Sequence, residues 1–272
     1  MSDQLPPLPK PVPRHGRRNI IVFVIIGAIA GFLSGLFGVG GGTVIVPLLT
    51  LMLGFAARPA AGISSAAIIV TAAVGVVSYA VRGDVDWGVA GVIAAAAIIG
   101  AQLGVRLLFK LHEATLRWIF VAFLVVVAVS LFLVVPSRDA VFDWNVISVL
   151  GLLLLGLLTG VLSGLIGVGG GIVVMPVLML AFGVSDLVAK GTSLLMVIPT
   201  SLSGTIANFR RGNVDLVAAA CIGGTGCLLA PLGTITAHVV DPKVGNILFV
   251  CFLVVIGTQM TLKAIRAGRK KS

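Results

Sequence analysis

Ionisable side chains are scarce in this sequence. Lysine and arginine together number 19 and aspartate and glutamate 9 among 272 residues, so 10% of the chain is charged while 58% is hydrophobic. Soluble domains typically carry about 25% charged residues. This composition, with a mean hydropathy of +1.19, excludes an ordinary soluble domain and indicates an all-α polytopic membrane protein.

Groups that carry acid–base, redox or metal chemistry are also few inside the apolar segments. A carboxylate, lysine or arginine at the centre of the membrane normally marks an ion or proton pathway, and here such residues lie near predicted segment ends. No carboxylate pair, Ser-His-Asp set or metal cluster can be assembled from these segments. The sequence therefore argues against an enzyme, and we expect no metal and no cofactor.

Cysteine is rare and lies in apolar segments of the second half of the chain. None of the three cysteines has the spacing to a histidine that a metal site requires. We interpret Cys221, Cys227 and Cys251 as buried small apolar residues.

Much of the positive charge lies at the two ends of the chain. Residues 1–19 are basic and rich in proline, which predicts a disordered tail, and 264–272 form a second basic tail. Basic segments that flank apolar spans normally face the cytoplasm. We therefore attribute the net charge of +10 to membrane orientation, with both termini in the cytoplasm, a lipid bilayer as the partner and no nucleic acid.

Between the tails, the chain divides into two membrane repeats. The first covers 20–135 and the second 145–263, and a linker of mixed charge at 136–144 is expected outside the cell. Each repeat contains five apolar segments. An odd number of segments inverts the second repeat relative to the first.

One apolar segment in each repeat is short. Thr43–Phe55 and Ile172–Phe182 fall well below the roughly 20 residues that cross a bilayer as a helix. They either re-enter the membrane from one side or cross it where the protein is thin. We therefore expect eight to ten spans.

The short segments belong to a motif that the chain carries twice. The pattern Gly-x-x-Ser-Gly-x-x-Gly-Val-Gly-Gly-Gly-x-x-x-x-Pro begins at Gly31 and again at Gly160, 129 positions later. Identities continue at the same offset without a gap, as in the Gly-x-Val-Asp motifs at Gly83–Asp86 and Gly212–Asp215. Self-similarity at a fixed period indicates an internal duplication.

Each glycine run predicts a break in a helix. Glycine is a poor helix former and tolerates positive φ, so a helix should end at the run and a new one begin near Thr43 in the first repeat. The new helix presents unpaired N–H groups and the positive end of its dipole, and Pro47 fits its first turn. Two such N-termini, one per repeat, predict a site that holds an anion without a charged side chain.

We assign the substrate contacts to both glycine runs and to hydroxyl groups near them. The candidates are Gly40, Gly41, Gly42, Thr43, Ser64, Thr71, Gly169, Gly170, Gly171, Thr192, Ser193 and Thr200. Each hydroxyl has an alternative role as a hydrogen bond to its own helix or to a neighbouring one. The glycines before the break, such as Gly31 and Gly35, fit close helix packing instead.

These residues resemble a known family. The doubled glycine motif, the segment Ala189–Leu194 with its weaker echo at Ala61–Ser64, and the two Gly-x-Val-Asp motifs are similar to the sulfite exporter TauE/SafE family of membrane permeases. The resemblance covers residues 20–265 and implies a permease in the bacterial inner membrane for sulfite, sulfoacetate or related organosulfonates. Ile63 stands where the second repeat has Thr192, so the first half of the site is expected to be less polar there.

Two functions from different classes remain open at this point. One is an anion permease. The other is a non-transporting membrane scaffold or accessory subunit, for which duplication and glycine packing would suffice. A homodimer is compatible with both.

The ionisable groups nearest the membrane interior are Asp186, Lys190 and His238, which we interpret as solvated loop charges. On that basis the protein has no group that takes up a proton midway. The negative cell interior favours the exit of a monovalent anion by about 2.3 kcal/mol per 100 mV. We therefore expect electrogenic uniport of anions rather than proton antiport.

Overall fold

The computed structural model of this protein describes residues 17–112, 115–116, 118–119, 121–122, 125–126, 129, 142 and 144–269. These residues form helices and no strand, as predicted. The helices are α1 (Arg17–Phe37), α2 (Gly42–Met52), α3 (Ala57–Ala80), α4 (Trp87–Lys110), α6 (Val146–Ile166), α7 (Gly171–Phe182), α8 (Asp186–Phe209), α9 (Leu216–Val239) and α10 (Pro242–Arg269). The tail at 1–19 and the linker at 136–144 lie largely outside the described residues.

Seven of these helices are long and apolar enough to cross a membrane. The two exceptions are α2, with 11 residues, and α7, with 12. At about 1.5 Å per residue, neither could cover the roughly 30 Å hydrocarbon layer of a bilayer. The chain is therefore a multi-pass membrane protein in which two short helices do not cross by themselves.

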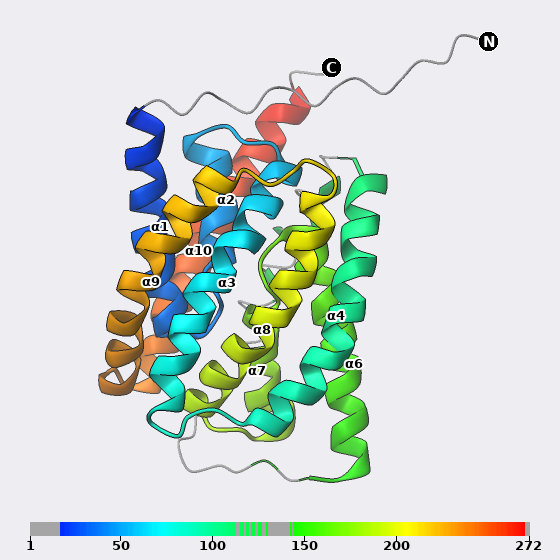
Figure 1. Ribbon diagram of the computed structural model, residues 1–272, viewed down its shortest axis with the longest axis vertical. Coiled ribbons are helices and arrows are strands. Elements are labelled where there is room, and N and C mark those ends of the chain that lie inside the picture. The colour runs from blue at the N-terminus through cyan, green and yellow to red at the C-terminus, as the bar shows by residue number, and fades with distance from the viewer. Residues whose placement is uncertain are drawn as a thin grey trace, which may run out of the picture.

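The directions of the neighbouring helices show that α2 and α7 return toward the side from which the preceding helix started. In Figure 1, α1 and α3 both begin toward the upper end of the bundle, so α2 returns toward the side from which α1 started. In the second half, α6 and α8 both begin toward the lower end, and α7 returns there. The start of α1 and the end of α10 share the upper end. The short segments are therefore re-entrant in form, which the sequence left open.

Three stretches that look like loops in the sequence belong to helices. Arg58 and Pro59 lie in the first turn of α3, where a proline removes no helical hydrogen bond. The expected turn at Asp186–Lys190 is the first turn of α8, because the Ser185 hydroxyl accepts the Val188 N–H and caps this helix early. His238 belongs to the last turn of α9.

The Gly-x-Val-Asp motifs serve the fold at these helix ends. Gly83 has φ +80° and makes the turn after α3, and Asp86 caps α4 by accepting the Val89 N–H at 2.9 Å. Gly212 and Asp215 do the same before α9. A carboxylate at this position satisfies a helix N–H that has no partner within the helix.

Long helices from the two repeats pack in close pairs, α1 against α9 and α4 against α6. A Cβ on Gly31 of α1 would lie 2.0 Å from the carbonyl oxygen of Gly226 on α9, and one on Gly160 of α6 would lie 2.2 Å from that of Ala97 on α4. Gly31 and Gly160, like Ala97 and Gly226, are 129 positions apart. Equivalent residues of the two repeats therefore make reciprocal contacts, while the inverted orientation in the membrane stays a prediction.

The two ends of the bundle are closed by different side chains. At the lower end in Figure 1, His238 Nε2 lies 2.7 Å from Asp84 Oδ2. At the opposite end, Arg58 donates to the carbonyl of Leu111 at 3.1 Å, and the guanidinium of Arg211 lies 4.2 Å from the centre of the Phe109 ring. Phe109 and His238 occupy equivalent positions in the two repeats.

We expect Gly31→Ala to destabilise the protein by about 1–3 kcal/mol, because the new methyl group would push the backbones of α1 and α9 apart. The measurement is thermal unfolding in detergent. Gly91→Ala on α4 is the matched control, since a Cβ there meets no atom within 4 Å. Equal unfolding temperatures for the two variants would contradict close packing at Gly31.

Candidate functional site

Both glycine runs adopt a left-handed backbone, as their composition predicted. Gly38, Gly40 and Gly41 have φ of +70°, +79° and +83°. The equivalent residues Gly167, Gly169 and Gly170 have +75°, +84° and +82°. Residues with a Cβ rarely adopt this conformation. Each run ends one helix and starts the next within four residues.

The N-termini of α2 and α7 carry backbone donors that have no partner in the described part of the chain. The carbonyl of Gly41 accepts the N–H groups of Val44 and Ile45, both at 3.0 Å. Among the described residues, the N–H groups of Gly42 and Thr43 have no acceptor, and neither N-cap glycine offers a side chain. The start of α2 therefore combines the positive end of a helix dipole with two N–H groups that have no acceptor among the described residues.

Pro47 lies one turn later in α2 than the sequence indicated. It is the sixth residue of the helix rather than part of its first turn. Proline has no N–H, so the carbonyl of Thr43 lacks its usual donor four residues on. Pro176 has the same place in α7. Each short helix thus leaves one carbonyl of its first turn without that bond.

The two breaks are joined by a reciprocal pair of hydrogen bonds. Ser64 of α3 donates to the carbonyl of Gly167 at 2.6 Å, and Ser193 of α8 donates to that of Gly38 at 2.5 Å. The breaks also touch directly, since a Cβ on Gly42 would lie 2.5 Å from the Cα of Val168. The structure therefore brings all six predicted glycines, Ser64 and Ser193 into one region.

Four of the predicted hydroxyls already use their single hydrogen. The Ser64 and Ser193 hydroxyls bind the opposite break, as above. Thr71 donates to the carbonyl of Ile68 at 3.1 Å, with that of Gly40 at 3.5 Å, and Thr200 donates to the carbonyl of Met196 at 2.7 Å. An anion accepts hydrogen bonds and donates none. In this conformation these four hydroxyls act within the protein, and their assignment to the substrate stays a prediction.

Thr43 and Thr192 differ from those four and from each other. The Thr192 oxygen accepts the Asp86 N–H at 2.9 Å, which places it at the turn before α4 and away from the breaks. The hydroxyl by which Thr192 differs from Ile63 therefore bonds the turn before α4 and not the breaks. The Thr43 hydroxyl is fully buried at the start of α2 and has no partner in the described part of the chain.

Two further hydroxyls were not among the predicted contacts. Ser34 and Ser201 are buried, and neither hydroxyl has a partner among the described residues. The Ser201 oxygen lies 3.2 Å from the position of a Cβ on Gly169. Ser34 stands inside the repeated motif and Ser201 follows Thr200, but nothing in the sequence separates them from hydroxyls that bond their own helix.

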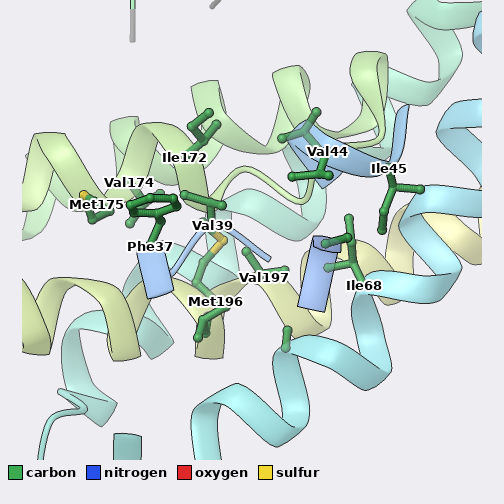
Figure 2. Packing of buried hydrophobic residues seen from close by; sticks show 14 of the residues in the cluster. Phe37, Val39, Val44, Ile45, Ile68, Ile172, Val174, Met175, Met196 and Val197 are labelled. Atoms are coloured by element: carbon green, nitrogen blue, oxygen red, sulfur yellow. The ribbon is translucent and has the colours of Figure 1, made fainter. Parts of the chain in front are cut away.

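Apolar side chains fill the space around the breaks. Ile68 and Val197, which are 129 positions apart, both lie against Gly40 and Gly169. In Figure 2, Val197 lies next to Val39, and Ile68 lies on the side of Val44 and Ile45. The site is therefore enclosed, with polar backbone inside an apolar shell. A cavity of about 470 Å³ lies instead near the turn before α4, lined by Asp86, Trp87, Gly83, Gly88, Val85, Phe142, Val184 and Val188.

The interpretation of Asp186 and Lys190 as solvated loop charges is wrong. Asp186 is 1% exposed and Lys190 5%, and Lys190 Nζ lies 3.2 Å from Asp186 Oδ2 within α8. His238 is also largely covered, with 16% of its side chain exposed. Both side chains are buried within the bundle, because α8 starts at Asp186 rather than after Lys190.

The cysteines are not buried as expected. Cys221 and Cys227 are half-buried and Cys251 is exposed on α10, where the small polarisable side chain suits an apolar surrounding. In the described part of the chain, no three histidine, cysteine, aspartate or glutamate residues are grouped closely enough for a metal ion.

A bundle of apolar helices with two interrupted helices that meet inside it defines a multi-pass membrane transporter. A family model described as "Sulfite exporter TauE/SafE" matches residues 4–131 and 152–272. The chain therefore belongs to the sulfite exporter TauE/SafE family, as its motifs indicated.

Several related proteins agree with this class. The chain is 29% identical over 251 residues to a probable membrane transporter protein of Xylella fastidiosa (strain 9a5c), covering 88% of this chain and 95% of the relative. It is 27% identical over 203 residues to the probable membrane transporter protein YdhB of Bacillus subtilis, covering 73% and 80%. Sulfite exporter TauE/SafE family protein 1 of Arabidopsis thaliana is 28% identical over 131 residues, covering 48% and 29%. No solved structure matches significantly.

We expect Gly41→Val and Gly170→Val to abolish anion binding while the protein still inserts into the membrane. A β-branched side chain strongly disfavours the left-handed backbone that starts the short helix. Binding is measured as anion-dependent thermal stabilisation of the purified variants.

The matched control for these variants is Gly83→Val. Gly83 has φ +80°, close to the +83° of Gly41, but a Cβ there meets no atom within 4 Å and the residue lies at a surface turn. It carries the same backbone strain away from the breaks. Normal binding by Gly41→Val, or equal loss in Gly83→Val, would contradict a role for the break itself.

Proposed function

We propose that this membrane transporter is a permease for small oxyanions, which bind at the N-termini of α2 and α7. The observation that carries the proposal is the pair of N–H groups at the start of α2, beside the buried Thr43 hydroxyl, all without a partner among the residues that the structure describes. Backbone donors at a helix N-terminus favour negative charge. The buried hydroxyls of Ser34 and Ser201 supply further donors nearby.

Sulfur-containing anions are the proposed substrates. The name of the family supports sulfite, and sulfoacetate and related organosulfonates present the same tetrahedral or pyramidal group of sulfur-bound oxygens. Several oxygens on one centre suit several donors that converge from different helices. We also propose the bacterial inner membrane as the location, with both termini in the cytoplasm.

The expectation of uncoupled uniport does not follow from this structure. It depended on an interior without ionisable groups, and Asp186 and Lys190 are buried. Buried ionisable residues in membrane segments commonly belong to ion or proton pathways. Flux under imposed voltage and pH gradients therefore tests whether transport is coupled to protons.

We expect sulfite or sulfoacetate to raise the unfolding temperature of the purified protein, because a ligand that binds the folded state stabilises it. In proteoliposomes the same anions should cross, compared with taurine and sulfate under imposed voltage and pH gradients. A membrane scaffold or accessory subunit would show neither stabilisation nor flux. That result would overturn the proposal.

Orientation has its own test. In a variant without Cys221, Cys227 and Cys251, we expect Arg82→Cys to react with an impermeant thiol reagent on intact cells. Arg210→Cys should react only after the cells are permeabilised, because basic loops face the cytoplasm. Both arginines are exposed at turns. Reaction of both sites on intact cells would contradict the predicted topology.

A further inference from the structure

A lysine and an aspartate form a buried ion pair beside the first break. Lys190 Nζ lies 3.2 Å from Asp186 Oδ2, and the two side chains are 6% and 2% exposed. Charges removed from water lose several kcal/mol of hydration free energy each, and the attraction within an ion pair often does not restore it. A buried pair of this kind needs an explanation beyond local stability.

The stem of Lys190 packs directly on the backbone of the break. A Cβ on Gly38 would lie 2.5, 2.6 and 2.9 Å from the Cα, Cβ and Cγ of Lys190. Ser193, one turn further along α8, donates to the carbonyl of Gly38 and lies 2.8 Å from the carbonyl of Lys190. The lysine is therefore fixed to the same short segment of chain that leads into the N-terminus of α2.

The first repeat forms the equivalent helix start without an ion pair. The first repeat has Ala57 and Ala61 where the second has Asp186 and Lys190, 129 positions later. Ala61 packs on Gly167 as Lys190 packs on Gly38, with its Cα 2.4 Å from the position of a Cβ on that glycine. Two alanines thus build the same helix start and the same contact with a break. The charges serve something other than this packing.

We propose that Lys190 is the positive charge that receives the transported anion, and that Asp186 holds its ammonium group while the site is empty. This inference rests on the proposed anion permease and adds a residue to its site. An ammonium group has three donors. An oxyanion at the start of α2 competes with Asp186 for them, so the charge of the lysine is balanced in both states.

Other ionisable groups surround the pair and remain in place in the test. Tyr79 of α3 lies within electrostatic range of Asp186, and its hydroxyl donates to the carbonyl of Gly35 at 2.8 Å. Asp84, from the turn after α3, pairs with His238 of α9, whose ring lies 5.5 Å from that of Tyr79. Arg82 lies in the same turn as Asp84.

The experiment compares the two partners of the pair, because the proposal predicts opposite effects. Affinity for sulfoacetate and for sulfite is measured from anion-dependent thermal stabilisation of the purified protein. Lys190→Gln should weaken binding at least about tenfold, as expected for the loss of a charge-assisted hydrogen bond. Asp186→Asn should strengthen it, because the competing carboxylate is gone.

The double variant Asp186→Ala with Lys190→Ala is the matched control for folding. It copies Ala57 and Ala61 of the first repeat, so it should fold and bind weakly. Lys190→Arg keeps the positive charge and should bind more tightly than Lys190→Gln. These two variants separate lost binding from lost structure.

Three results would overturn the inference. One is unchanged affinity in Lys190→Gln while the native protein binds anions, which would leave the proposed function standing. Another is equal weakening by both single changes with recovery in the double variant, which would make the pair structural. A native protein that binds none of the anions would overturn the permease as well.

Discussion

The two hydrogen bonds between the breaks are the contacts on which this structure depends. Each serine, Ser64 or Ser193, reaches the first glycine carbonyl of the opposite repeat, at Gly167 or Gly38. Those carbonyls are accessible because the glycine backbone is left-handed and the helix has ended. The bonds hold the starts of α2 and α7 together inside an apolar shell, where an unpaired carbonyl would cost more than in water. The proposed anion site and the packing of the breaks therefore depend on the same two hydrogen bonds.

Equivalent positions in the two repeats carry different chemistry at the two ends of the bundle. Asp84 and His238 close one end with a contact between a carboxylate and an imidazole. Phe109 stands in place of His238 at the other end, and Arg58 and Arg211 lie over its ring. A transporter that opens its ends in turn would thus break a carboxylate–imidazole contact at one end and cation–π contacts at the other.

The two repeats also differ in the charged residues that they place inside the protein. The second repeat contributes the buried pair Asp186 and Lys190, and the first contributes alanines at those positions. The first repeat in turn contributes Thr43, where the second has Ile172. The stem of a lysine from the second repeat therefore packs on Gly38 of the first repeat, four residues before the start of α2. The two repeats thus differ in the side chains that they place next to the breaks.

The sequence by itself determined the helical membrane class, the duplication, the position of both breaks and the family, because these follow from composition, periodicity and the conformational freedom of glycine. It could not determine which hydroxyls are already bonded, since Ser64 and Gly167 meet only after the two repeats pack. The same limit applies to Asp186 and Lys190, which look like loop charges until the Ser185 cap starts α8 before them. Burial of a charge depends on neighbours that are distant in the chain, so only the tertiary structure decided it.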